Sequence, residues 1–196
     1  MDSTNSKILL TGFEPFANFK VNSSWEAVRL MAAKGGNLLA CECLQVDYHS
    51  ARKQLASLLE LHQPESCLCT GLAVGDRFRL ERYARKPEQF NDLKGSTLYT
   101  GQWPWDEAME SFRETNLPAL SSKDAGQYVC ESTYWSLLDF RNRHGYPEKA
   151  AFLHVPPLSE DWPVEKIASG IIAMLSWGER SPHQSLSRRG HKKSRP

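Results

Sequence analysis

The sequence contains no uninterrupted run of about 18 apolar residues, the length that a membrane-spanning helix requires. Its first seven residues lack the apolar stretch of a secretory signal. Phosphate-binding loops are also missing: there is no GxxxxGK[ST] pattern, and the glycines at 71 and 75 lack the third glycine of GxGxxG. We therefore expect neither a membrane protein, nor a secreted one, nor a nucleotide-binding one.

Neither sign of charge dominates, because 24 Lys and Arg against 23 Asp and Glu give a net charge of +1. That balance argues against a nucleic-acid partner. The charge is uneven, however: residues 179–196 carry six bases and one acid (+5), and residues 1–178 carry 18 bases and 22 acids (−4). The polar tail has too little apolar surface to fold. We expect a flexible segment 1–6, one domain over 7–178, and a disordered basic tail that solubilises the chain, with weak polyanion binding as the lesser alternative.

Cysteine is scarce and odd in number, with five residues in 196. An odd count without a secretory signal indicates free thiols in a reducing, cytoplasmic compartment. Cys41-x-Cys43 and Cys67-x-Cys69 lie in apolar runs, whereas zinc sites generally use two to four residues between cysteines. We expect both pairs to pack within strands as small hydrophobic residues, with a metal site as the lesser alternative.

Short apolar runs alternate with helical patterns, which predicts an α/β domain. A Ser-x-x-Glu capping box at Ser23 and Glu26 marks the start of the first helix. Residues 85–104 show little periodicity. The predicted strands are 7–11, 38–46, 66–70, 78–84, 119–121 and 150–155, and the predicted helices are 23–34, 50–62, 107–114, 128–143 and 164–177.

Cys130 differs from the other cysteines because it falls at the start of a predicted helix, after the turn signal Ala125-Gly126. Free N–H groups and the helix dipole favour negative charge there, which lowers the pKa of a thiol and activates it as a nucleophile. The alternative is a core cysteine in a buried helix. Position alone does not separate these two interpretations.

A nucleophilic cysteine needs a base and a group that orients the base. His154 ends the apolar strand AFLHV, where α/β proteins place functional groups, although a buried structural histidine fits equally well. Glu81 alternates with Leu80 and is a candidate orienting carboxylate. The competing interpretation is an ordinary ion pair of Glu81 with Arg79 or Arg82.

The segments LLTGFEPF (9–16), VNSSWEA (21–27), SKDAGQYVC (122–130) and FLHVP (152–156) occur in this order along the chain. Together they resemble the pyroglutamyl-peptidase I family, also called pyrrolidone-carboxylate peptidases. A weaker match covers Gly71 and residues 80–84. The resemblance spans about residues 7–178, and several ordered motifs are far more specific than one.

The resemblance implies a single-domain three-layer α/β/α sandwich with a mixed, mostly parallel sheet. It implies a cytoplasmic cysteine exopeptidase that removes an N-terminal pyroglutamyl residue from peptides through a thioester, without metal or cofactor. By motif, Cys130 is the nucleophile, His154 the acid and base, and Glu81 the orienting carboxylate, while Phe13 and Phe16 flank the lactam ring. Asn22 lies in the same loop and is a candidate substrate-binding residue. The family also implies a homo-oligomer, often a tetramer.

Departures from the family pattern concentrate in residues 72–95. Leu72 replaces a glutamine, Arg79 a threonine and Lys86 an asparagine, and the usual arginine-bearing loop is not recognisable, with Arg85 a weak stand-in. These changes leave open a cysteine hydrolase of related N-terminal amides or lactams, or a non-catalytic binder of modified peptide N-termini. The tryptophans of the segment GQWPWD (101–106) either cap the substrate cleft or pack on the body or a neighbouring subunit.

Overall fold

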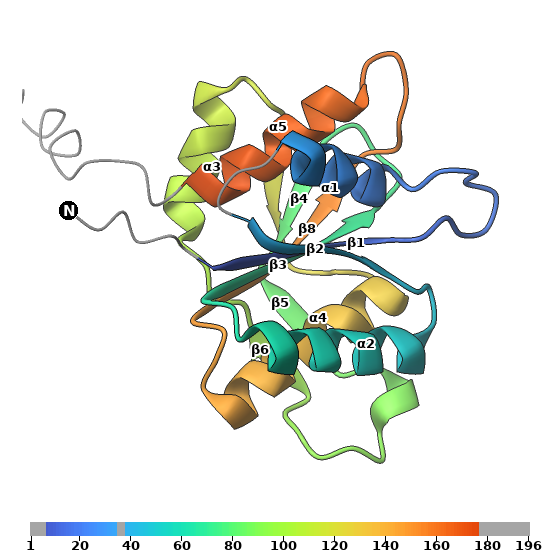
Figure 1. Ribbon diagram of the computed structural model, residues 1–196, viewed down its shortest axis with the longest axis vertical. Coiled ribbons are helices and arrows are strands. Elements are labelled where there is room, and N and C mark those ends of the chain that lie inside the picture. The colour runs from blue at the N-terminus through green and yellow to red at the C-terminus, as the bar shows by residue number, and fades with distance from the viewer. Residues whose placement is uncertain (1–6, 35–37, 177–196) are drawn as a thin grey trace, which may run out of the picture.

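The computed structural model describes residues 7–34 and 38–176, so the predictions for segments 1–6 and 179–196 lie outside the described residues. In this part of the chain a six-stranded sheet has the order β2-β1-β3-β8-β4-β7 (Figure 1). Its strands are β1 (Ile8–Phe13), β2 (Leu38–Leu44), β3 (Ser66–Leu72), β4 (Phe78–Glu81), β7 (Ala119–Ser122) and β8 (Lys149–Val155). A small antiparallel sheet pairs β5 (Tyr83–Arg85) with β6 (Leu98–Thr100).

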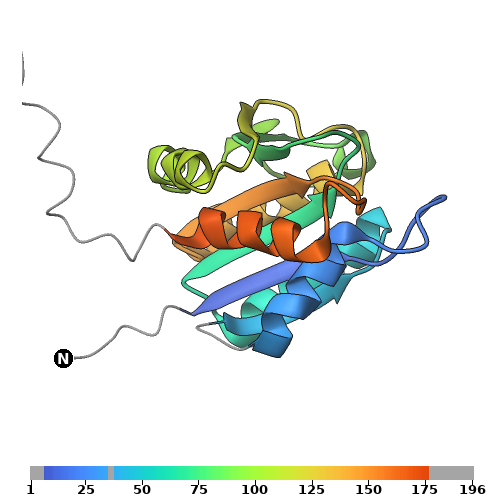
Figure 2. The same ribbon diagram turned by 90° about the horizontal axis from the view of Figure 1, so that it is seen from above.

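Helices cover both faces of the large sheet, as Figure 1 shows. The helices on one face are α1 (Ser23–Lys34), α3 (Trp105–Glu114) and α5 (Val164–Leu175), and those on the other are α2 (Tyr48–His62) and α4 (Val129–His144). Seen from above, α1 and α5 lie side by side across the sheet, with α3 beyond α5 (Figure 2). The predicted three-layer sandwich is therefore confirmed.

The predicted mixed, mostly parallel sheet is also confirmed. Strands β2, β1, β3 and β8 run parallel, whereas β4 pairs antiparallel with β8 and parallel with β7. Alternation along β8 sends Phe152 into the core under α2 and α4, and Leu153 into the core under α1, α3 and α5. The sheet thus divides the apolar interior into two cores.

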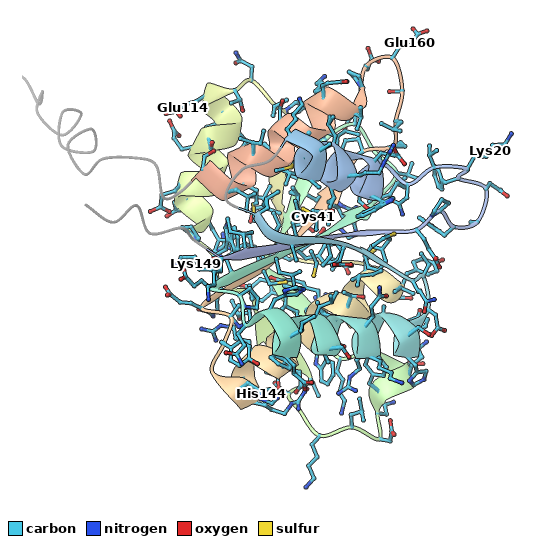
Figure 3. The ribbon with its side chains drawn as sticks, in the orientation of Figure 1. Lys20, Cys41, Glu114, His144, Lys149 and Glu160 are labelled. Atoms are coloured by element: carbon cyan, nitrogen blue, oxygen red, sulfur yellow. The ribbon has the colours of Figure 1, made fainter. Side chains whose placement is uncertain are left out.

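Two side chains labelled in Figure 3, Lys149 and Lys20, mark the two ends of the sheet. Lys149 begins β8 at one end of the sheet, and Lys20 lies near the tip of the loop that follows β1 at the other end. His154 comes near the end of β8, so it belongs to the end of the sheet from which the Lys20 loop extends. His144 is exposed at the last position of α4 (Figure 3).

Two local predictions were wrong. The predicted strand 78–84 is two strands in different sheets, because the backbone of Arg82 bonds to Ser122 and Gly101 and leads the chain out of the large sheet. The irregular segment 85–104 also holds β6 and a 3₁₀ turn at Glu88–Phe90. Their short lengths leave no periodicity to detect.

The N-terminal cap of α1 also differs from the prediction. Asn22, not Ser23, caps the helix, since its Oδ1 accepts from the backbone N and the Oγ of Ser24 at 3.1 and 2.8 Å. Asparagine is among the preferred capping residues. The helix itself begins at Ser23, as predicted.

The paired cysteines lie in strands, as predicted. Cys41 and Cys43 are half-buried in the edge strand β2, and Figure 3 shows Cys41 at the level of the sheet. Cys67 and Cys69 are buried in β3. The described residues contain no group of three or more His, Cys, Asp or Glu arranged to hold a metal ion.

The two tryptophans of segment 101–106 do not cap a cleft. Trp103 and Trp105 are 7% and 8% exposed and belong to the core beneath α3 and α5. Trp103 Nε1 donates to the carbonyl of Met174 at 3.0 Å, and the Arg82 guanidinium lies 4.8 Å from the Trp105 ring centroid. The alternative of packing on the body of the domain is the correct one.

We predict that Gly12→Ala destabilises the fold. A Cβ at Gly12 would lie 2.7 Å from Cα and N of Trp25, where the backbone of β1 meets the start of α1. Because backbone atoms cannot rotate away, we expect a loss of about 1–3 kcal/mol in the free energy of unfolding. Urea unfolding measures it. The control Ala33→Ser, at an exposed site on α1, should change stability by less than about 0.5 kcal/mol; equal stability of Gly12→Ala and wild type would contradict the close approach.

Candidate active site

A cavity of about 880 Å³ opens where the parallel strands β1, β3 and β8 end and α4 begins. The crevice at the carboxyl ends of such strands is the usual ligand site of α/β proteins. Its lining is mostly apolar, with few polar side chains. The lining residues are Phe13, Phe16, Ala17, Phe19, Asn22, Val46, Tyr48, Leu72, Ala73, Val74, Arg79, residues 124–130 and His154.

Cys130 is the second residue of α4, and Tyr128 occupies the capping position without a side-chain cap. The turn before the helix uses Gly126 at φ 90°, with its N–H donating to Asp124 Oδ1 at 3.0 Å. A Cβ on Gly71, in β3, would lie 2.8 Å from Cys130 Sγ, so the absence of a side chain there leaves room for the thiol. The thiol is half-buried and lines the cavity.

The expected low pKa of this thiol was wrong. Burial raises the pKa of Cys130 to about 12, and the nearby charge of Glu81 adds to the rise. The charge of Arg79 and a hydrogen bond from the Cys130 backbone act in the opposite direction but do not overcome the desolvation. In the free protein Cys130 is therefore a neutral thiol at pH 7, and it needs a base to become a nucleophile.

His154 and Glu81 form a buried pair. His154 Nδ1 lies 2.8 Å from Glu81 Oε1, with the two residues 3% and 0% exposed. The carboxylate can only accept, so Nδ1 carries the proton and Nε2 keeps its lone pair. Burial lowers the pKa of His154, against the effect of Glu81, so the ring is neutral at pH 7. The structure brings together the predicted base and carboxylate, and the ring lines the same cavity as Cys130.

The register between β4 and β8 explains why Glu81 and His154 lie in contact. Arg79 and His154 are directly opposed on antiparallel strands, and Glu81 is opposite Phe152. Since residues two apart share a face, all four side chains lie on the α4 side of the sheet. The alternative that Glu81 pairs with an arginine is also partly met: Arg79 Nε lies 3.5 Å from Glu81 Oε1, and Arg82 does not pair with it.

Phe13 and Phe16, which the family resemblance names as substrate-binding residues, both line the cavity. Phe13 is 2% exposed and packs on Phe152 with centroids 6.5 Å apart, and Phe16 packs on Phe19 at 5.5 Å. Asn22 lines the cavity too, yet its polar atoms already serve the fold. Its Oδ1 caps α1 and its Nδ2 donates to the carbonyl of Glu14 at 3.0 Å.

The sequence assigned no cavity role to several lining residues, among them Arg79, Val74 and Tyr128. Arg79 was noted only as a departure from the family pattern and as a competing partner of Glu81. Val74 and Tyr128 are 79% and 78% exposed; Val74 lies in a loop, and Tyr128 is the residue before the first turn of α4. Arg85, the weak stand-in, does not line the cavity. It bonds to the carbonyl of Lys123 and holds the loop before α4.

The half-buried thiol of Cys130 and the imidazole of His154, which is hydrogen-bonded to a carboxylate, lie at one cavity of an α/β/α sandwich. This combination is typical of thiol-dependent hydrolases, so the protein is a candidate member of that class. Comparisons with known proteins narrow that class. The family model described as pyroglutamyl peptidase matches residues 6–89 and 84–176. The pyrrolidone-carboxylate peptidase of Bacillus velezensis is 31% identical over 172 residues, covering 79% of this chain and 80% of that protein.

A further relative and a solved structure point to the same family. The pyrrolidone-carboxylate peptidase of Thermococcus kodakarensis is 31% identical over 167 residues, covering 76% of this chain and 81% of that protein. The crystal structure of Bacillus amyloliquefaciens pyroglutamyl peptidase I has a TM-score of 0.74 and 28% identity, covering 89% of this chain and 98% of that one. The chain belongs to the pyroglutamyl peptidase family and is an enzyme of the pyroglutamyl-peptidase I type. In its described residues no helix is both long and apolar enough to cross a membrane.

We predict that Asn22→Ala lowers stability more than it affects substrate binding. The change removes the α1 cap and the donor to Glu14, at a cost of about 1–2 kcal/mol in the free energy of unfolding. Asn22→Ser, which keeps a capping oxygen, should lose less. Urea unfolding of both variants, beside KM for any substrate that is turned over, tests this. A higher KM at unchanged stability would assign Asn22 to substrate instead.

We predict slow alkylation of Cys130 at neutral pH, because burial raises its pKa and little thiolate is present. The rate with iodoacetamide should rise about tenfold per pH unit between pH 7 and 9.5, while a free thiol with a pKa of about 8.5 levels off in that range. Mass spectrometry assigns the modified cysteine, and circular dichroism confirms folding at each pH. A rate that is already constant below pH 7 would show a low-pKa thiolate.

Proposed function

We propose that this chain hydrolyses the amide bond after an N-terminal pyroglutamyl residue of peptides, with Cys130 as nucleophile, His154 as acid and base, and Glu81 as orienting carboxylate. The observation that carries the proposal is the buried Nδ1–Oε1 hydrogen bond of 2.8 Å, on an imidazole that shares its cavity with Cys130. Membership of the pyroglutamyl peptidase family supports the choice of substrate.

The proposed reaction starts from neutral groups. His154 Nε2 takes the proton of the Cys130 thiol as Sγ attacks the scissile carbonyl carbon. The imidazolium formed is stabilised by Glu81, and it returns the proton to the departing amine, which leaves a thioester. Water, deprotonated by His154, then attacks the thioester and releases 5-oxoproline and the free thiol. Backbone N–H groups at the start of α4 can donate to the oxyanion.

The raised pKa of Cys130 fits this sequence of steps. A neutral thiol costs no desolvated charge before the substrate binds, and the proton leaves only when a base is aligned. His154, held neutral by burial, is that base at pH 7. Charge therefore develops during the reaction rather than before it.

The cavity suits a small neutral ring. Phe13, Phe16 and Phe19 supply aromatic surface near the ends of β1 and its loop. A five-membered lactam is flat, uncharged and in need of only one or two polar partners, as ligand sites of this kind provide.

A second candidate function is hydrolysis of a related N-terminal amide or lactam. The observation that favours it is the guanidinium of Arg79, placed in the cavity beside His154. A charged group at this position suits substrates other than a neutral lactam. Leu72, another departure from the family pattern, also lines the cavity.

We predict release of the leaving group from a pyroglutamyl chromogenic amide, and much slower release from the prolyl and glutamyl amides. Cys130→Ser should lower kcat by at least about 10³-fold, and Glu81→Gln by about 10²–10⁴-fold, because the imidazole loses its orienting carboxylate. Rates are followed by absorbance, with circular dichroism as the check on folding.

Cys43→Ser is the matched control, since Cys43 is half-buried in the edge strand β2 and does not line the cavity. It should keep wild-type activity within about twofold. No release from the pyroglutamyl amide by folded wild type would overturn the leading proposal. Faster release from another amide would favour the second candidate. Binding of a pyroglutamyl peptide without turnover would indicate a non-catalytic binder.

A further inference from the structure

Arg79 places a cation at the catalytic pair. Its side chain is 34% exposed, lines the cavity, and approaches two buried groups: Nε lies 3.5 Å from Glu81 Oε1, and a terminal nitrogen lies 3.4 Å from His154 Nδ1. Among the described residues that line the cavity, Asp124 is the other one with a charged side chain. It is 73% exposed, and its Oδ1 lies 3.6 Å from a terminal nitrogen of Arg85. Arg79 is therefore the cation of this lining.

The hydrogen-bonding needs of Arg79 are not met by these neighbours. His154 Nδ1 already donates its proton to Glu81 at 2.8 Å, so it has no lone pair to accept from the guanidinium. The contact at 3.4 Å therefore brings two donors together. Nε is buried and has no hydrogen-bond partner, because its contact with Glu81 is an ion pair without hydrogen-bond geometry. A guanidinium presents five N–H donors, and because the Arg79 side chain is 34% exposed and lines the cavity, its terminal N–H groups can be satisfied by an acceptor there.

A carboxylate is the ligand that such a group binds best, through paired charge-assisted hydrogen bonds. The chemistry at Cys130 supplies one in a fixed place. When the thioester is hydrolysed, the carbon that was the scissile carbonyl becomes a carboxylate, and it is released beside Cys130 and His154, which line the cavity with Arg79. The peptide substrate has a neutral amide at the same carbon.

We propose that Arg79 makes this cavity a binding site for the free carboxylate of a five-membered lactam acid, 5-oxoproline, so that the product binds more tightly than its neutral amide and inhibits the enzyme by competition. The inhibition rests on the proposed function, but the binding does not. Glu81 partly offsets the charge of the guanidinium, with Oε1 3.5 Å from Nε. The affinity for a carboxylate therefore depends on how the terminal N–H groups of Arg79 are oriented.

The test compares two ligands of equal shape on folded wild type at pH 8, where His154 is neutral. Isothermal titration calorimetry measures the dissociation constants of 5-oxoproline and of its neutral amide, 5-oxoprolinamide. We expect the acid to bind about 10-fold to 100-fold more tightly, as a charge-assisted hydrogen bond supplies. Equal affinities, or tighter binding of the amide, would overturn the proposal without any variant.

Arg79→Met keeps an unbranched apolar side chain in place of the aliphatic part of arginine and removes the charge, so the preference for the acid should disappear. Arg79→Lys keeps the charge and should retain part of the preference for the acid. Arg77→Met is the matched control, because Arg77 pairs with Asp76 on the surface and does not line the cavity; it should keep the full preference. A preference that survives in Arg79→Met would assign it to another group and overturn the proposal.

Turnover separates this inference from the proposed function. Tight binding of 5-oxoproline that depends on Arg79, in a protein that does not cleave the pyroglutamyl amide, would keep the binding site and reject the peptidase assignment. Cleavage of the pyroglutamyl amide by a protein that does not prefer the acid would keep the peptidase assignment and reject the carboxylate-binding site. In an active enzyme, 5-oxoproline should inhibit competitively, with an inhibition constant that rises about 10-fold or more in Arg79→Met; an unchanged constant would overturn the inference.

Discussion

The buried hydrogen bond between His154 and Glu81 is the interaction on which the chemistry of this site depends. It fixes which ring nitrogen holds the proton and leaves Nε2 free toward the cavity. It also offsets part of the cost of burying a carboxylate that has no exposed surface and whose other oxygen, Oε2, has no hydrogen-bond partner among the described residues. Neither group would be stable alone at this depth, so the two side chains position each other.

The direction of one strand creates this pair. Strands β1, β3 and β8 run parallel and end at the cavity, as in many α/β proteins, but β4 runs the opposite way beside β8. That reversal brings the beginning of β4 to the cavity, so Arg79 is directly opposite His154 and Glu81 lies one pleat deeper. A parallel β4 would have placed its last residue at the edge instead. The buried position of the carboxylate therefore follows from topology.

The sequence predicted most helices and strands because their apolar periods are clear. It made Cys130 and His154 candidates because one begins a predicted helix and the other ends a predicted strand, whereas Phe13 and Phe16 were named only by the family resemblance. Two kinds of feature escaped it. Burial is a property of packing across the sheet, so the helix start alone wrongly predicted a low pKa for Cys130, whereas desolvation prevails and raises it. Loop residues such as Val74 have no period, and the cavity role of Arg79 depends on a strand register that one sequence does not reveal.

Arg79 changes the electrostatic character of the pair rather than its geometry. A guanidinium beside Glu81 and the imidazole keeps the trio of Arg79, Glu81 and neutral His154 at zero net charge, whereas Glu81 and His154 alone would carry −1. Burial lowers the pKa of His154 and raises that of Cys130, and Arg79 lowers both. It therefore makes the imidazole a weaker base and the thiol a stronger acid, two changes that oppose each other in the transfer of a proton from the thiol to the imidazole. The charge that lowers the pKa of the thiol is the same one that we propose binds a carboxylate ligand, so the two effects have one physical origin.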